Sequence, residues 1–448
     1  MRDDLVDLAA RVARQARPGE EVEAYVAWSR ETSVEAYSGE VESLSSADAE
    51  GVGVRVVSGS RQGYAYAGSL DPAVIAQVLE DARDNATFTT PDEFVGLPEP
   101  DGVVAADIDP WSDEMASVAT ADKVAVALEL ERVVRASDPR IRQVEAASYG
   151  DVTSVVAVAS SKGVNAFQRR TGAYLSVYAL AGEGDDTQTG GGYSVGRSLS
   201  DLDVEKAAAD AVERATRLLG AKKPRSVRLP VVFDKRVTTT LLGIVASTFS
   251  GEAVLKGRSL FADRLGDNVA ASSVTLVDDP TLAEAFGASR YDGEGLASRR
   301  NVLIRSGVAD HFLYDSYSGR RAGAAPTGSA VRAGFKSGPG VGHRAVYLVP
   351  GDKDAEQIMR EVGNGLLVQS VIGVHSGVNP VSGDFSVGVE GLMIRDGELA
   401  EPVREATIAS TLQRMLLDVS HVGNDMEWLP GSAAGVTLAV DGISLSGS

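Results

Sequence analysis

The sequence contains no cysteine and only four histidines in 448 residues. Without a thiol, the chain can form no disulfide, no cysteine-ligated zinc or iron–sulfur centre and no cysteine nucleophile. The histidines, His311, His343, His375 and His421, are too widely spaced to place two imidazoles on one helix as an H-E-x-x-H motif does. A zinc site within this chain would therefore have to be assembled from distant histidines.

Basic residues and long apolar runs are also scarce. The chain has 63 Asp and Glu against 43 Lys and Arg, a formal net charge of −20, and this excess repels nucleic-acid phosphates. No apolar run approaches the roughly 18 residues of a membrane-spanning helix. Residues 1–21 have the pattern of a helix rather than of a signal peptide. We therefore expect a cytoplasmic protein that binds neither nucleic acid nor a membrane.

Short sequence matches indicate an internal repeat in the N-terminal half. Each copy has a helix, several strands with alternating polarity, such as residues 51–57 and 173–180, and a closing helix. The second copy has a longer hairpin, at whose apex we place Gly190–Gly192. The matches are Gly63-Tyr64, Asp81-Ala82 and Ala86-Thr87, which recur 129 residues later as Gly192-Tyr193, Asp210-Ala211 and Ala215-Thr216.

The domain organisation follows from this repeat. We predict an α+β protein in which residues 1–220 form a duplicated domain, an antiparallel sheet with helices on one face. The copies span about residues 1–90 and 120–220, and a Pro-rich acidic linker covers residues 89–112. Residues 230–448 read as a β-rich C-terminal domain, with one long helix over residues 235–254 and helices near residues 354–363 and 408–417.

Two groups of residues outside the predicted core are candidates for chemistry. Turn-forming residues in the segment 373–391 precede an alternating strand, and their small size allows the backbone of a peptide to add to a sheet edge. A tight turn without a ligand explains the same pattern. The predicted peptide-groove residues are Asn379, Pro380, Ser382, Gly383, Asp384 and Phe385. Asp278, Asp279, Asp292 and Glu294 are candidate carboxylates of a metal-independent hydrolase, although their Gly and Pro neighbours favour turns.

A series of short segments in this order resembles the TldD/PmbA family, also called TldD/TldE. The matching segments run from residue 51 to residue 425, so the resemblance covers nearly the whole chain. It implies an α+β N-terminal region, a β-rich C-terminal domain and a cytoplasmic zinc metallopeptidase of two paralogous subunits that acts on unfolded or small peptides. The segments include GVGVRVV at 51–57, KGRS at 256–259, YDGEG at 291–295, NVLIRSG at 301–307, YDSYSG at 314–319, NPVSGDFS at 379–386 and VGND at 422–425.

The departures from the family pattern identify the type of subunit. The resemblance implies an H-E-x-x-x-H helix just before the Lys-Gly motif of a catalytic subunit, and a cysteine ligand after the Gly-Asn-Asp motif. Here the helix positions read LGIVAS, with Leu242 and Ser247 in place of the histidines, and no cysteine follows Asp425. The chain therefore resembles the non-catalytic TldE/PmbA-type subunit, with no catalytic residue, no metal ligand and no cofactor of its own, and with zinc in an H-E-x-x-x-H partner.

Two arrangements fit this resemblance. The chain forms a heterodimer with a TldD-like paralogue and helps to bind unfolded or small peptides, or it is a stand-alone homodimeric peptide-binding protein without peptidase activity. The size of the native complex and the presence of a second type of subunit distinguish the two.

Overall fold

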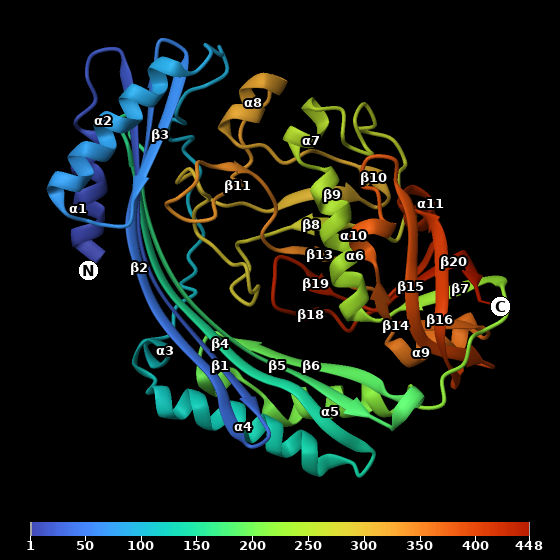
Figure 1. Cartoon of the computed structure of the whole chain (residues 1–448). Helices are drawn as coiled ribbons and strands as arrows, with labels where there is room; N and C mark the ends of the chain where they lie inside the picture. Colours follow the sequence, from blue (N-terminus) through green and yellow to red (C-terminus); the bar gives the residue numbers. More distant parts are fainter. Residues whose placement is uncertain (1, 448) are drawn as a thin grey trace.

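The computed structural model describes residues 2–447, and its N-terminal part is built around one six-stranded sheet (Figure 1). The strand order is β3-β2-β1-β4-β5-β6, and all neighbouring strands are antiparallel. Each copy contributes three consecutive strands, so the copies meet where β1 pairs with β4, and the predicted duplication is confirmed. The elements are α1 (Arg2–Ala13), β1 (Glu20–Tyr37), β2 (Glu40–Ser58), β3 (Arg61–Ala67) and α2 (Pro72–Phe88), then α3 (Asp113–Ser117), α4 (Thr120–Ser137), β4 (Ile141–Ser160), β5 (Asn165–Ala181), β6 (Gln188–Gly196) and α5 (Val204–Thr216).

The sheet curves around the C-terminal domain, with the long helices on its outer, convex face (Figure 1). Alternation along β1 explains this arrangement, because Val22, Ala24 and Val26 are fully buried in a core shared with α1 and α2. The intervening residues Glu23 and Tyr25 point to the concave face. Side chains on that face meet loops of the C-terminal domain, and they form the candidate site described below.

The glycines at 190–192 lie within strand β6 and not at a hairpin apex, which corrects the prediction. A Cβ at Gly190 would lie 2.2 Å from the carbonyl oxygen of Ala211, and one at Gly192 would lie 1.8 Å from that of Ala207. Glycine is present because helix α5 packs directly on the backbone of β6. In the first copy Gly63 meets Ala82 of α2 in the same way, at 1.9 Å.

Six strands of the C-terminal domain form a sheet in the order β16-β15-β14-β7-β20-β17, and β16 also pairs with β20. This extra pairing closes the sheet into a barrel, so the predicted β-rich domain is confirmed. A second sheet has the order β10-β9-β8-β13. The strands are β7 (Val227–Phe233), β8 (Leu276–Asp278), β9 (Asn301–Arg305), β10 (Val308–Ala309), β11 (Ala330–Val331), β12 (Gly340–Val341), β13 (Val346–Leu348), β14 (Gly365–Ile372), β15 (Asp384–Arg395), β16 (Glu398–Thr411), β17 (Val419–Val422), β18 (Glu427–Trp428), β19 (Ala434–Gly435) and β20 (Leu438–Ser446).

The helix expected over residues 235–254 is two helices, α6 (Lys235–Thr248) and α7 (Gly251–Leu255). The backbone is extended at Ser250, and the N–H of Gly251 donates to the carbonyl of Leu313 at 2.7 Å. A tertiary hydrogen bond therefore replaces the helical one at this point. The remaining helices are α8 (Ser316–Ala322), α9 (Ala355–Val362), α10 (Val374–Gly377) and α11 (Leu412–Leu417).

The helix predicted near residues 408–417 is wrong in its first half. Strand β16 continues to Thr411, because Thr407, Ile408 and Ala409 pair with β15 on one side and with β20 on the other, where the barrel closes. Thr411 then caps α11 by accepting a hydrogen bond from the N–H of Arg414 at 3.2 Å. Among residues 2–447, no helix is long and apolar enough to cross a membrane.

Candidate functional site

Helix α6 carries the positions at which the resemblance expects two zinc ligands in a catalytic subunit. Asp234 caps the helix by accepting the N–H of Arg236 at 2.9 Å. Leu242 belongs to the apolar stripe and is 3% exposed in the barrel core. Ser247 lies about 140° further around the helix, is exposed and donates to the carbonyl of Ile244 at 2.6 Å. The two side chains point in different directions and offer no metal ligand, so these residues do not fit a zinc ion.

The four histidines have separate surroundings. His421 Nε2 lies 2.8 Å from a carboxylate oxygen of Glu361, and His375 is exposed on α10. His311 is partly buried, and burial lowers its pKa. Burial also lowers the pKa of His343. Within residues 2–447, no three His, Cys, Asp or Glu side chains are grouped so that they could hold a metal ion.

The predicted peptide-groove segment forms a closed turn before β15. The side-chain oxygen of Asn379 accepts the N–H groups of Val381 at 2.9 Å and Ser382 at 3.2 Å, and its backbone N–H donates to the carbonyl of Asp384 at 2.9 Å. Phe385 is 2% exposed and belongs to the barrel core. Its ring therefore stabilises the domain and does not face a groove.

The other residues of this segment show no free sheet edge. Pro380, Ser382 and Asp384 are exposed, while Gly383 is buried with a φ of +85° beneath the side chain of Gln413. Strand β15 pairs with β16 along its length and with β14 over most of it, and Val378 bridges to Phe385 where β14 ends. Both edges of β15 are thus occupied, and peptide contact by the exposed turn stays a prediction.

Asp278 and Asp279 are buried and bind nearby backbone. Asp278 accepts the N–H groups of Arg344 at 2.9 Å and Ala345 at 2.8 Å, and burial raises its pKa despite these hydrogen bonds. Asp279 accepts the N–H of Thr281 at 3.1 Å. Both carboxylates hold nearby backbone in place. Asp278 is the last residue of strand β8 and not a turn residue, which corrects the prediction for it, whereas Asp279 follows the strand.

Asp292 and Glu294 are likewise buried, at 1% exposure each. Asp292 accepts three backbone N–H groups, from Glu294 at 2.9 Å, Leu296 at 3.0 Å and Ala330 at 3.1 Å. Burial, followed by the charge of Glu294, raises the pKa of Asp292 to about 7. Glu294 accepts the N–H of Ser316 at 2.8 Å and faces the N-terminal sheet.

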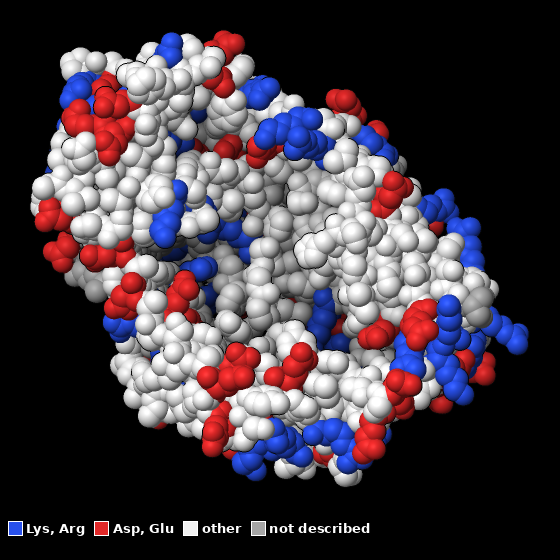
Figure 2. All heavy atoms as spheres, in the orientation of Figure 1, with Lys and Arg blue, Asp and Glu red and all other residues white. Residues whose placement is uncertain are grey.

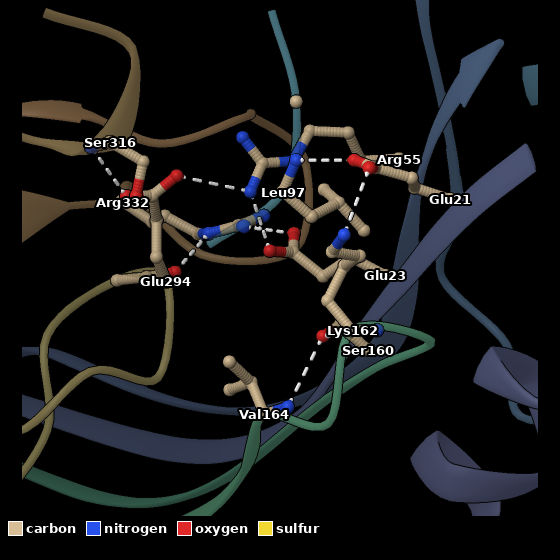
Figure 3. Close-up of polar contacts among 12 residues, drawn as sticks. Glu21, Glu23, Arg55, Leu97, Ser160, Lys162, Val164, Glu294, Ser316 and Arg332 are labelled. Carbon is tan, nitrogen blue, oxygen red and sulfur yellow. Dashed lines mark hydrogen bonds and ion pairs between the residues drawn. The ribbon is translucent and has the colours of Figure 1, made fainter. Parts of the chain in front are cut away.

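Two arginines and two glutamates form a buried ion network between the sheet and the C-terminal domain (Figure 3). Glu23 and Arg55 lie directly opposite each other on β1 and β2, and their side chains meet at 2.6 Å. Arg55 also meets Glu294 at 3.1 Å, and Arg332 pairs with the other oxygen of Glu23. All four side chains are at most 4% exposed. The network fixes the concave face of the sheet to the C-terminal loops.

Next to this network, a cavity of about 880 Å³ opens between the sheet and the C-terminal loops. The strand register explains its floor, because Ala49, Ser29 and Ser154 stand side by side on β2, β1 and β4, and their small side chains leave space. In the same row, Arg170 on β5 stands opposite Ser154. The walls come from residues 286–289, 331–336, 343–344 and 431–432.

The cavity is rich in positive charge although the chain is acidic. Five Lys or Arg line it, against one acidic residue, Glu31, and Figure 2 shows Lys and Arg atoms gathered inside the hollow between the two parts of the molecule. Aromatic rings contribute much of the remaining wall. The basic residues are Arg169, Arg170, Arg332, Lys336 and Arg344, and the aromatic residues are Tyr25, Trp28, Phe286 and Phe335.

Neither the network nor the cavity was predicted from the sequence. The alternation of apolar and polar residues along residues 20–31 separates the two faces of a strand. It predicts that Glu23 and Glu31 face solvent. The signal that was present is the run of small polar and apolar residues on the concave face, such as Ala27 and Ser29. That run shows that the face carries little bulk and does not show which loops cover it.

Family models cover most of the chain. The model of the PmbA/TldA metallopeptidase domain 1 matches residues 22–86, that of the central domain matches residues 113–219, and that of the C-terminal domain matches residues 226–447. The first two matches correspond to the two copies that share the N-terminal sheet.

Individual relatives agree with these matches. "Metalloprotease PmbA" of Escherichia coli O157:H7 is 29% identical over 94% of this chain and 92% of its own length. "Metalloprotease TldD homolog" of Haemophilus influenzae is 28% identical over 84% of this chain and 80% of its own. The solved structure of TldE from Thermococcus kodakarensis has the same fold, with a TM-score of 0.86 and 24% identity over 95% of this chain and 97% of that one. With its three matched domains and this fold, the chain belongs to the PmbA/TldD metallopeptidase family.

Proposed function

We propose that this chain is the non-catalytic subunit of a cytoplasmic TldD/TldE-type zinc metallopeptidase complex that processes unfolded or small peptides. It pairs with an H-E-x-x-x-H paralogue and contributes surface that holds the peptide. The chemistry that a zinc ion would supply, once bound by that partner, is Lewis-acid catalysis of peptide hydrolysis. This chain binds and orients the substrate and transfers no proton.

The observation that carries the proposal is the chemistry of α6. A catalytic zinc helix needs two imidazoles and a general base on its accessible surface. In this chain Leu242 is part of the core, Ser247 is a small exposed hydroxyl, and the residue after Leu242 is glycine. A helix with these side chains supports the domain and cannot bind zinc.

The test is to purify the native complex and then to analyse the isolated chain. We expect the chain alone to contain less than stoichiometric zinc and to leave an unfolded test peptide intact. Addition of an H-E-x-x-x-H paralogue should produce cleavage that a chelator abolishes. Stoichiometric zinc together with chelator-sensitive cleavage by the isolated chain would overturn the proposal. A native complex that contains this chain alone, as a dimer, would favour the stand-alone peptide-binding protein.

A further inference from the structure

The cationic cavity holds more positive charge than its acidic side chains neutralise. Arg169 pairs with Asp109 and Arg332 pairs with Glu23. Within residues 2–447, Arg170, Lys336 and Arg344 form no ion pair with an acidic side chain. Three cations without an acidic partner in that range therefore face one cavity of a chain whose net charge is −20.

Repulsion among these arginines adds to the imbalance. The enclosing walls, which limit hydration, and next the charge of Arg344 lower the pKa of Arg170, although its side chain stays accessible to solvent. Burial and then the charge of Arg170 lower the pKa of neighbouring Arg197 to about 10. An anion in the cavity would relieve this repulsion, because each guanidinium can donate to a carboxylate.

Two buried N–H groups on the same wall also lack a partner. Nη1 of Arg332 and Nε of Arg344 are inaccessible to solvent and form no hydrogen bond within the described chain. Arg332 is itself 1% exposed. Buried donors without an acceptor are costly, but both atoms are closed to solvent, so they strain this wall and do not themselves face a ligand in the cavity.

The rest of the wall defines the kind of anion. A cavity of about 880 Å³ is within the size range of ligand pockets, and Tyr25, Trp28 and Phe335 supply apolar contact area. Glu31 lies on the same floor and interacts with Arg170. A carboxylate at one end and a cation at Glu31 suit a zwitterionic peptide, whereas a phosphate would pair with the cations and leave Glu31 without a cationic group of the ligand.

We propose that this cavity is a carboxylate-binding subsite that holds a peptide through its α-carboxylate or an acidic side chain, with Arg170 and Lys336 as the main cations. The proposal rests on the proposed function, in that it assigns the peptide-holding role to named residues. It also places the peptide contact on the concave sheet face and not at the turn of residues 379–384.

Calorimetric titration of the purified chain with short synthetic peptides tests the subsite. Three versions of one peptide are used: a free C-terminus without acidic residues, the same peptide amidated, and the amidated peptide with one internal Glu. We expect the free-acid form to bind at least about 10-fold more tightly than the neutral amide, since a charge-assisted hydrogen bond is lost. The Glu-containing amide distinguishes the sources: tight binding shows that a side chain suffices, and weak binding assigns the site to the α-carboxylate.

Variants locate the effect in the cavity. Arg170→Met and Lys336→Met should each weaken binding of the free-acid peptide about 10-fold, and higher salt should weaken wild-type binding. The control Arg225→Met removes an exposed arginine of the segment between α5 and β7 and should change nothing. Equal affinity for the acid and the amide, or unchanged binding by both cavity variants, would overturn the subsite. Those results would leave the non-catalytic assignment untouched, because zinc content and cleavage test it separately.

Discussion

Replacement of Glu23 by glutamine tests whether the buried network joins the two parts of the molecule. Glu23 is 1% exposed and accepts hydrogen bonds from both Arg55 and Arg332. In Glu23→Gln, Arg55 keeps Glu294 as an acidic partner, whereas Arg332 loses the acidic partner that it has within the described network. The side-chain NH2 of the new glutamine would also face a guanidinium, which is itself a donor, so no hydrogen bond forms there. The variant therefore leaves an uncompensated positive charge in a dry site.

The expected cost is large because the charges cannot be rehydrated. Removal of one partner from a buried ion pair typically costs about 3–5 kcal/mol, and we expect a loss of this size in the free energy of unfolding. Burial alone would raise the pKa of Glu23, but the charges and hydrogen bonds of Arg332 and Arg55 lower it overall. Its folded pKa is thus below the unfolded value, so the stabilisation is present above about pH 4 and is lost at lower pH.

Urea denaturation followed by tryptophan fluorescence measures the change. A matched control comes from the same pair of strands, because Arg30 and Asp48 also face each other across β1 and β2, and both are about half exposed. Asp48→Asn should leave stability nearly unchanged, since solvent screens that pair. The double variant Glu23→Gln with Arg332→Met should cost about 1–3 kcal/mol less than the sum of the single variants. A Glu23→Gln effect no larger than that of Asp48→Asn would refute the reasoning.

Two further predictions concern a titrating carboxyl group and a packing glycine. The pKa of Asp292 is raised to about 7 in the folded protein, so Asp292 keeps a proton there that it releases above about pH 4 in the unfolded chain. The wild-type protein therefore loses stability as the pH rises from about 4 to about 7. In urea titrations from pH 5 to pH 8, Asp292→Asn should therefore be less destabilised relative to wild type at pH 8, and a pH-independent difference would contradict this assignment. Gly192→Ala places a Cβ 1.8 Å from a carbonyl of α5 and should cost at least about 1–3 kcal/mol. In the same thermal or urea melts, Gly243→Ala on α6 meets nothing within 4 Å and should stabilise the protein by up to about 1 kcal/mol; equal effects of the two alanines would refute direct packing of α5 on β6.

Sequence patterns predicted the N-terminal fold because its signals are local and occur twice. Alternating residues in each strand and matched helix positions such as Ala82 and Ala211 report which residues share a face. Pairing between strands that lie far apart in the sequence was harder to predict. The helical spacing of Ile408 and Leu412 suits a helix, yet Ile408 belongs to a strand because β20 closes the barrel against it. Ile408 pairs with Leu445, 37 residues later in the chain, and the local spacing of apolar residues does not report this pairing.

The candidate site also has one part that the sequence shows and one part that it does not. The absence of histidine at Leu242 and Ser247 can be read directly, because the expected motif lies on one helix, and the lack of a zinc ion in this chain stays a prediction. The cavity could not be predicted, since Arg170, Lys336 and Arg344 come from three separate segments. Isolated arginines in a sequence normally belong to a solvated surface. Only the register of the sheet and the cover provided by the C-terminal loops bring these cations together.

Arg332 connects the network to the cavity. Its Nε donates to the carbonyl of Gly293 at 2.5 Å, one terminal nitrogen pairs with Glu23, and its guanidinium lies 4.9 Å from the ring centre of Tyr25 on the cavity wall. Loss of Glu23 releases a group that shapes the cavity, so we expect stability and the proposed peptide affinity to decrease together in Glu23→Gln. In the part of the chain that the structure describes, Arg170 forms no ion pair within 4 Å, so we expect Arg170→Met to lower the proposed affinity and to leave stability nearly unchanged. If Glu23→Gln lowers both affinity and stability while Arg170→Met lowers affinity alone, then Arg170 supplies the charge that binds the ligand. Arg332, held by Glu23, then maintains the shape of the cavity.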